Sequence, residues 1–192
     1  MDRKDVREKS RRILSDGYMR VIDLVLDAPR FSGAMMENVS REIVLRADAA
    51  AALVHDVERD VFILAEQFRF PAYEAGEGWL VELVAGKVDG DEKPEACIIR
   101  EIEEEIGYRA KKLESVATYF AAPAYSTERI HLFYAPVKSS DLVNADARGV
   151  DEGEDIRRVE LPRAEFLDRL SQRDFLDNKL LAMSGWAIKR FG

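Results

Sequence analysis

Residues 86–108 read GKVDGDEKPEACIIREIEEEIGY, with one proline inside the segment and glycines toward both ends. Pro94 suits the first turn of a helix, where its missing N–H group would have no helical partner in any case. Gly107 suits the position just after a helix, where the backbone often turns left-handed. The sequence therefore predicts a helix from Pro94 to Ile106 between two loops.

The predicted helix has two different faces. At 100° per residue, positions three and four residues apart lie on the same side. Two stripes follow from this spacing, an acidic one of Glu101, Glu104 and Glu105 and an apolar one of Ile99, Ile102 and Ile106. Carboxylates that point the same way repel one another, so they are either solvated or share a cation. Oxygen ligands favour Mg²⁺ or Mn²⁺, although such a run taken alone is most often a solvated face.

The composition indicates an ordinary globular protein. The chain has 192 residues, 47% of them hydrophobic, which is enough for one core with a small appended piece. Its 37 acidic and 29 basic residues give a net charge of −8, which repels nucleic-acid backbones, and no basic patch offsets it. The charged N-terminus does not read as a secretory signal, and no apolar run approaches the roughly 20 residues that cross a bilayer. We expect a cytoplasmic protein with neither a nucleic-acid nor a membrane partner.

Apolar periodicity places further elements along the chain. Strands are expected at 18–26, 39–45, 49–54, 61–68, 79–84, 115–120, 130–137 and 156–161, and further helices at 164–172 and 178–191. The first two strands suggest a small antiparallel sheet ahead of the main domain. The later strands and helices interleave without the long βαβ spacing of a doubly wound fold, so the sequence predicts a mixed α/β sandwich.

The spacing within the acidic segment matches a known signature. Gly86, then Glu92 after five residues, then residues 100–105 after seven more, and then Gly107 resemble the Nudix box, the loop–helix–loop motif of the Nudix hydrolase family. All seven fixed residues are present, and at frequencies of about one in fifteen such a match arises by chance roughly once in 10⁸ starting points. Tyr108 departs from the aliphatic residue that the family usually has, at a place without a catalytic role. With this resemblance, we interpret the acidic stripe as residues that share a cation and not as a solvated helix face.

The resemblance implies a fold and a division of the chain. Residues 47–192 are expected to form a Nudix hydrolase domain, an α+β fold in which an α/β/α sandwich surrounds a mixed central sheet. Residues 1–46 are expected to form a small N-terminal antiparallel sheet that serves dimerisation. In similar enzymes such sheets swap between subunits, and a few strands without a core are only marginally stable alone. We therefore expect a domain-swapped homodimer.

The box residues imply a metal site. In similar enzymes the glutamates that correspond to Glu101 and Glu105 bind a divalent metal ion. The residue that corresponds to Glu104 lies nearby, and the backbone carbonyl at the position of Ala85 completes the coordination shell. The bound metal neutralises a diphosphate and lowers the pKa of a bound water molecule. The resemblance thus implies Mg²⁺ as the cofactor, with Mn²⁺ as the alternative.

Catalysis also requires a base and ordered ligands. Residues 149–156 read GVDEGEDI and resemble the acidic loop of ADP-ribose pyrophosphatases and GDP-mannose hydrolases, in which a glutamate activates the water. Glu152 takes this role by position and Glu154 is the second choice, whereas without the resemblance the segment would be an acidic surface turn. Arg100 is implied to brace the loop by pairing with a carboxylate such as Glu92, which orients the ligands.

Two further matches concern the substrate. Residues 66–69 read EQFR, as in the same branch of the family, where the arginine contacts the substrate's phosphates, so Arg69 is assigned that contact. Pro123 lies 16 residues after Gly107, a placement typical of ADP-ribose pyrophosphatases. Glu128 is a candidate for contact with the substrate or metal, and a solvated loop glutamate is the alternative.

The N-terminal segment also carries candidate substrate contacts. Arg41 and Glu42 match an arginine–glutamate pair that reaches the neighbouring subunit's active site in relatives. Residues 13–18, ILSDGY, resemble the GDP-mannose hydrolases in particular. Tyr18 would then stack on the base, and a plain sheet residue is the alternative.

The predicted function is metal-dependent hydrolysis of the diphosphate linkage in a nucleoside diphosphate sugar of the ADP-ribose or GDP-mannose type. Its products would be a nucleoside monophosphate and a sugar phosphate. The alternative is a non-catalytic nucleotide-sugar-binding regulator with the same fold, but a pure binder has no reason to keep a cluster of mutually repelling carboxylates. An enzyme for capped RNA or nucleoside triphosphates is disfavoured by the acidic net charge. Cys97 is expected to pack and not to act as a nucleophile.

Overall fold

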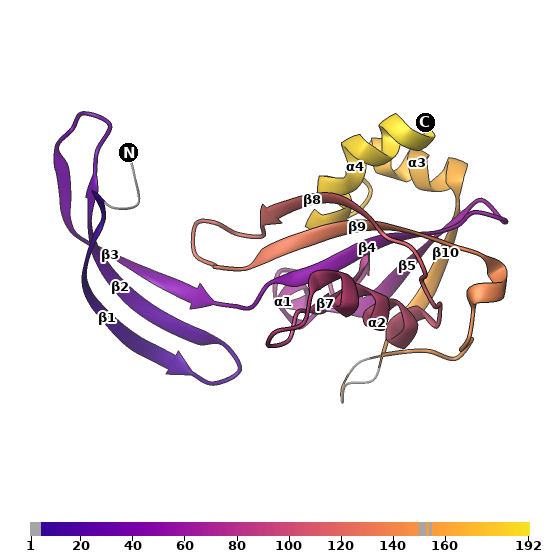
Figure 1. The fold of residues 1–192 in the computed structure, drawn as a ribbon, viewed down its shortest axis with the longest axis horizontal. Helices are drawn as coiled ribbons and strands as arrows, with labels where there is room; N and C mark the ends of the chain where they lie inside the picture. Colours follow the sequence, from indigo (N-terminus) through magenta and orange to yellow (C-terminus); the bar gives the residue numbers. More distant parts are fainter. Residues whose placement is uncertain (1–4, 150–152, 154) are drawn as a thin grey trace. The chain divides into compact units, whose positions relative to one another are not determined.

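The computed structural model describes residues 5–149, 153 and 155–192 (Figure 1). The strands are β1 (Arg7–Asp16), β2 (Arg20–Pro29), β3 (Met35–Leu45), β4 (Ala49–Asp56), β5 (Val61–Phe68), β6 (Trp79–Glu82), β7 (Val84–Lys87), β8 (Glu114–Phe120), β9 (Arg129–Val137) and β10 (Arg157–Pro162). The α-helices are α1 (Phe70–Glu74), α2 (Pro94–Ile106), α3 (Arg163–Gln172) and α4 (Asn178–Phe191), with a 3₁₀ turn at Ser139–Asp141. In this part of the chain no helix is both long enough and apolar enough to cross a membrane.

The central sheet is mixed, as the sequence predicted. Its strands follow the order β10-β5-β4-β9-β8, with β6 paired to β5 and β7 paired to β4. β4 runs parallel to β9 but antiparallel to β5 and β7. β4 changes partner along its length, since its first half pairs with β7 and its last three residues pair with β5. The short strands β6 and β7 therefore enter the sheet where β4 and β5 part, and they carry Glu82 and Gly86 to that point.

Helices cover both faces of the central sheet (Figure 1). Successive side chains of a strand point to opposite faces. Ala50, Ala52 and Val54 of β4 share a buried cluster with Ile98 and Ile102 of α2. On the other face the Phe62 ring lies 4.4 Å from the Phe166 ring of α3, measured between centroids, and Tyr134 lies 5.3 Å from Trp186 of α4. The predicted α/β/α sandwich is thus confirmed.

The packing face of α2 differs from the predicted one by one residue. Cys97, Ile98, Ile102 and Ile106 are completely buried, whereas Ile99 is only partly buried. The prediction of Ile99 as a core residue was wrong, because Ile98, Ile102 and Ile106 lie four residues apart on the buried face and Ile99 is rotated by 100° from Ile98. The helix bounds were correct, with Pro94 in the first turn and Gly107 left-handed after the last.

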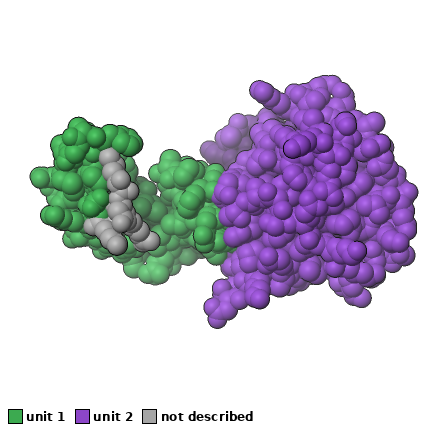
Figure 2. All heavy atoms as spheres, turned by 45° about the horizontal axis from the view of Figure 1, so that its top comes forward, with its two compact units in different colours: residues 1–48, 120–129 green, residues 49–119, 130–192 purple. Residues whose placement is uncertain are grey.

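A separate antiparallel sheet, β1-β2-β3, lies in the N-terminal segment, as expected. Residues 1–48 and 120–129 form one compact unit, and residues 49–119 and 130–192 form the other (Figure 2). The sequence did not reveal β1, because all ten residues of REKSRRILSD are exposed and show no apolar alternation. Strand β2 begins at Arg20, so Tyr18 lies in the turn before it and the expected strand start at residue 18 was wrong.

Gly107 gives the fold a direct stability test. Its φ is 77°, and a Cβ there would lie 1.7 Å from the backbone oxygen of Asn144. Gly107→Ala should therefore lower the free energy of unfolding by at least about 2 kcal/mol. Gly185→Ala is the matched control, because an added Cβ on this α4 residue meets nothing within 4 Å and should stabilise the helix by about 0.5–1 kcal/mol. Urea unfolding followed by circular dichroism measures both, and equal stabilities would contradict this account of Gly107.

Candidate active site

The acidic stripe of α2 is not a solvated face. Only 15% of the Glu101 side chain and 25% of the Glu104 side chain are exposed, and Glu105 is buried with 5% of its surface exposed. Glu105 is therefore more deeply buried than a residue of a solvated helix face. The structure places three carboxylates of one helix in a partly desolvated position, which raises the cost of leaving their charges uncompensated.

Arg100 compensates part of this charge. Its Nη1 donates to Glu101 Oε1 and to Glu104 Oε2, each at 2.8 Å, and its Nη2 lies 3.3 Å from Glu92 Oε2. The hydrogen bonds to Glu92, followed by the neighbouring carboxylates, raise the pKa of Arg100 despite its partial burial. The contact between Arg100 and Glu92 expected from the sequence is present. One guanidinium thus ties the loop before α2 to the acidic face of the helix.

Gly86 makes room for Glu101. A Cβ added to Gly86 would lie 1.9 Å from both Cδ and Oε1 of Glu101. The Glu101 side chain therefore lies directly against the backbone of β7. Ala85, the neighbouring residue of β7, pairs with Ala51 of β4. The backbone of β7 and the Glu101 carboxylate are therefore in contact at Gly86, the first residue of the Nudix box.

The donor chemistry fits a hard divalent cation. Glu101 and Glu104 offer carboxylate oxygens from one helix face, beside the backbone of Gly86, and no sulfur or imidazole ligand competes among these groups. Within the described ranges, no group of three or more histidine, cysteine, aspartate or glutamate side chains is arranged to hold a metal ion. The carboxylate oxygens of Glu101 and Glu104 point to the guanidinium of Arg100, with which both form ion pairs.

Arg69 lies at the start of α1 and pairs with a buried carboxylate. Its Nε donates to Glu82 Oε1 at 2.8 Å and its Nη2 to Glu82 Oε2 at 3.0 Å. Burial lowers the pKa of Arg69, but the Glu82 hydrogen bonds and the negative charges of Glu82 and Glu105 outweigh it, so the pKa is raised. Arg69 is therefore within electrostatic reach of the acidic stripe.

The other predicted substrate contacts belong to the unit of residues 1–48 and 120–129. Tyr18 is 97% exposed in the turn between β1 and β2. Arg41 and Glu42 are exposed on β3, and Arg41 Nη1 donates to the Ser40 backbone oxygen at 2.7 Å. Glu128 forms an ion pair of 3.1 Å with Arg46. Glu128 lies in a loop with 19% of its side chain exposed, and its role as a substrate or metal contact stays a prediction.

The two candidate bases, Glu152 and Glu154, lie outside the described residues. The residues that flank them are described. Gly149 N donates to the backbone oxygen of Glu104 at 3.1 Å, and Ile156, which is 1% exposed, donates to the backbone oxygen of Arg148 at 3.2 Å. Gly149, the last described residue before Glu152, is therefore hydrogen-bonded to the backbone of α2 at Glu104.

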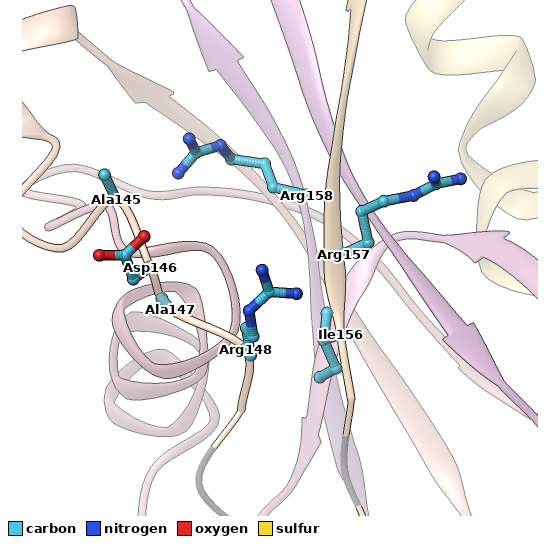
Figure 3. A pocket seen from close by; sticks show the side chains of 7 residues that line it. All are labelled: Ala145, Asp146, Ala147, Arg148, Ile156, Arg157 and Arg158. Atoms are coloured by element: carbon cyan, nitrogen blue, oxygen red, sulfur yellow. The ribbon is translucent and has the colours of Figure 1, made fainter.

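The same flanks line a cavity that the sequence did not reveal. It has a volume of about 180 Å³ and is lined by residues 145–148 and 156–158 (Figure 3). The side chains of Arg148 and Arg158 extend toward this cavity. The side chain of Arg157, which precedes Arg158 on β10, extends to the opposite side of the strand and pairs with Glu66. Basic residues thus flank the acidic segment in the sequence of a chain whose net charge is −8.

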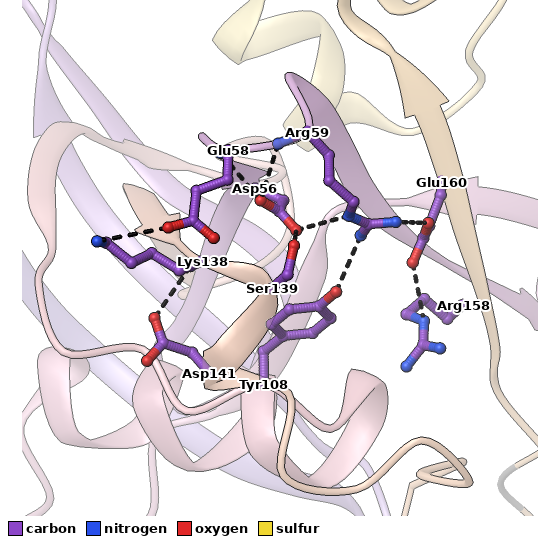
Figure 4. A network of polar contacts seen from close by, with 9 residues as sticks. All are labelled: Asp56, Glu58, Arg59, Tyr108, Lys138, Ser139, Asp141, Arg158 and Glu160. Atoms are coloured by element: carbon purple, nitrogen blue, oxygen red, sulfur yellow. Dashed lines mark hydrogen bonds and ion pairs between the residues drawn. The ribbon is translucent and has the colours of Figure 1, made fainter.

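A polar network supports the end of α2 (Figure 4). Asp56 is fully buried and accepts from Arg59 Nε at 2.7 Å and from Ser139 Oγ at 2.8 Å. Arg59 Nη2 donates to the Tyr108 hydroxyl at 3.0 Å, and Arg158 Nη1 donates to the backbone oxygen of Ile106, also at 3.0 Å. The tyrosine that departs from the Nudix pattern therefore has a partner for its hydroxyl group.

Cys97 is inert in this structure, which yields a test. The residue is completely buried, and burial, together with the negative charges of Glu101 and Glu92, raises the pKa of its thiol to about 12. Because only the thiolate reacts, a disulfide reagent at pH 8 should label the native protein at least about 100-fold more slowly than the urea-unfolded protein. The absorbance of the released thiol follows the reaction, and equal rates for native and unfolded protein would show that the thiol is accessible.

Comparison with known proteins agrees with the motif and the fold. A model of the NUDIX domain matches residues 45–179. The crystal structure of an ADP compounds hydrolase superposes with a TM-score of 0.71 at 19% identity, covering 97% of this chain and 93% of that chain. At this identity the likeness concerns the fold alone.

Closer relatives are found by sequence. GDP-mannose pyrophosphatases from Cronobacter sakazakii and from Escherichia coli O1:K1 are 34% and 33% identical to this chain over 174 residues, which are 90% of the chain and 89% of each relative. Both alignments run well beyond the box segment alone. Together with the complete box and the mixed α/β/α sandwich, these matches show that the chain belongs to the Nudix hydrolase family.

Proposed function

We propose that this protein hydrolyses the diphosphate linkage of a nucleoside diphosphate sugar of the GDP-mannose or ADP-ribose type. The products are a nucleoside monophosphate and a sugar phosphate. The observation that carries the proposal is the likeness to GDP-mannose pyrophosphatases over 90% of the chain at 33–34% identity. The acidic stripe of α2 and the cation Arg69 supply groups that this chemistry requires.

Nudix hydrolases generally need a divalent metal ion, and the oxygen donors of this site suit Mg²⁺, with Mn²⁺ as an alternative. Glu101, Glu105 and Glu104, together with the backbone carbonyl of Ala85, would hold it. When bound, the metal neutralises charge on the diphosphate and lowers the pKa of a water molecule. Arg100 orients the carboxylates by holding Glu101 and Glu104 in one hydrogen-bonded group.

The remaining roles concern the substrate and the water. Arg69 contacts the phosphates with the N–H groups that face away from Glu82. Glu152, or Glu154 in its place, accepts a proton from the attacking water. The water oxygen then forms a bond to one phosphorus, and the bond from that phosphorus to the bridging oxygen breaks. The hydrogen bond from Gly149 N to the backbone oxygen of Glu104 supports the assignment.

The N-terminal unit is proposed to complete the site in a domain-swapped homodimer. Tyr18, Arg41, Glu42 and Glu128 are its proposed substrate contacts. The exposure of Tyr18 supports this role, because a tyrosine with 97% of its surface exposed is available to stack on a nucleobase. The preference for Mg²⁺, the cytoplasmic location and the lack of a nucleic-acid partner stay predictions.

A substrate panel tests the function. Purified protein with Mg²⁺ should convert GDP-mannose or ADP-ribose to the nucleoside monophosphate and the sugar phosphate, measured by chromatography of the released monophosphate. Glu105→Gln should lower kcat at least about 100-fold, because it keeps the side-chain volume and removes a negative charge from the site. Glu103→Gln is the matched control on the same helix, since Glu103 pairs with exposed Arg109 at the surface, and its kcat should stay within about twofold of wild type.

Three results would count against the proposal. Absence of product from every nucleotide sugar at micromolar enzyme would reject hydrolysis. Tight binding of a nucleotide sugar without turnover would favour the regulator instead. Retention of more than about a tenth of the wild-type kcat by Glu105→Gln would remove Glu105 from the site.

A further inference from the structure

Four charged side chains form a continuous chain of hydrogen bonds from the start of α4 to Arg69. Lys179 Nζ donates to Asp177 Oδ1 at 2.7 Å and to Glu82 Oε2 at 3.0 Å. Glu82 in turn accepts both hydrogen bonds from Arg69. Glu82 and Lys179 are 97 residues apart in the sequence, so the fold alone brings them together. The chain joins the C-terminal helix to the residue proposed to contact phosphate.

This chain of ion pairs is withdrawn from solvent except at one end. Exposed fractions of the side chains are 3% for Asp177, 12% for Lys179 and 7% for Glu82, but 41% for Arg69. Burial raises the pKa of Glu82, yet Arg69 and Lys179 outweigh it and hold this pKa below its ordinary value. Burial lowers the pKa of Lys179, and the charges of Asp177 and Glu82 overcome that effect and raise it. Glu82, Lys179 and Arg69 are therefore charged at neutral pH.

At the exposed end, Arg69 keeps donors that no other described side chain engages. A guanidinium has five N–H groups in a rigid fork, and Glu82 engages one edge of that fork through Nε and Nη2. Among the residues that the structure describes, none bonds to the Nη1 edge, so this edge can contact an anion. Because Glu82 fixes the plane of the fork, an anion that binds this edge finds Arg69 already ordered and loses less entropy.

Docking of α4 does not by itself explain Lys179. Asp177 already caps this helix, since it accepts from the backbone N–H groups of Lys179 and Leu180, and it also holds the N–H group of Leu83 at 3.1 Å. A buried lysine adds a desolvation cost that the capping does not require. What Lys179 adds is a second cation on Glu82, which leaves that carboxylate no freedom to turn away from Arg69.

We propose that Asp177, Lys179 and Glu82 form a positioning relay that orders Arg69 for the diphosphate of the substrate. In this relay Lys179 acts through Arg69 and does not touch the substrate. The inference rests on the proposed function for the identity of the ligand, but the ordering of Arg69 is a property of the protein alone.

A double-mutant cycle on the full-length protein tests the relay. Lys179→Met removes the charge and keeps most of the volume, and it should raise KM for GDP-mannose about tenfold while kcat changes less than about threefold. In an Arg69→Ala background the same substitution should change KM less than about twofold, because the relay no longer has a cation to position. Lys189→Met, an exposed site on the same helix, is the matched control and should leave KM unchanged. If Lys179→Met does not fold, Glu82→Gln, which keeps the shape of the side chain, takes its place in the cycle.

A second measurement does not depend on turnover. In the free wild-type protein the Arg69 Nε–H group, bonded to Glu82, should give a protected signal in ¹⁵N NMR, and Lys179→Met or Glu82→Gln should abolish that protection. An equal rise of KM in the wild-type and Arg69→Ala backgrounds would overturn the relay, because Lys179 would then contact the substrate itself. Unchanged protection of the Arg69 signal in the variants would also overturn it. A protected signal in a protein that hydrolyses no nucleotide sugar would refute the proposed function and leave the relay intact.

Discussion

The contact between the backbone of Gly86 and the side chain of Glu101 is the constraint on which the site depends. A Cβ at residue 86 would lie 1.9 Å from the Glu101 carboxylate carbon, so strand β7 and helix α2 approach this closely only because residue 86 is glycine. β7 is itself fixed by its pairing with β4, and α2 is fixed by Ile98 and Ile102 in the core. The sheet and the helix therefore set the position of the carboxylate before any ligand binds, which is the preorganisation that metal-assisted hydrolysis requires.

The charged side chains of the site are stabilised by ion pairs and not by contact with solvent. The acidic stripe is partly or fully buried, and isolated carboxylates there would be expensive. Arg100 compensates Glu101 and Glu104, and the negative charge of Glu105 contributes to the raised pKa of Arg69. Buried ion pairs are weak contributors to stability, because desolvation offsets much of their attraction. Their presence in this site is better explained by the geometry that they impose on the charged groups.

Much of the fold could be predicted because its signals are local. The ends of α2 follow from Pro94 and Gly107, and the mixed sheet follows from interleaved apolar runs. Strand β1 could not be predicted, since exposed polar residues carry no periodicity, and Ile99 was misassigned because an offset of one residue changes the face of a helix. Among the site residues, the Arg100–Glu92 contact was foreseen from the box. The relay was not foreseen, because 97 residues separate Glu82 from Lys179, although an aspartate at 177 just before a helical segment is a recognisable N-cap signal.

The most direct test of this account is the affinity of the protein for Mn²⁺, measured by the electron paramagnetic resonance signal of the free ion. Gly86→Ala should push the Glu101 side chain out of its place against β7 and weaken Mn²⁺ binding by at least about tenfold, while Gly185→Ala leaves it unchanged. The Glu101 carboxylate is the flexible partner in this contact, so the substitution should leave the fold intact. Equal Mn²⁺ affinity of wild type and Gly86→Ala, with both proteins folded, would contradict the claim that this contact builds the metal site.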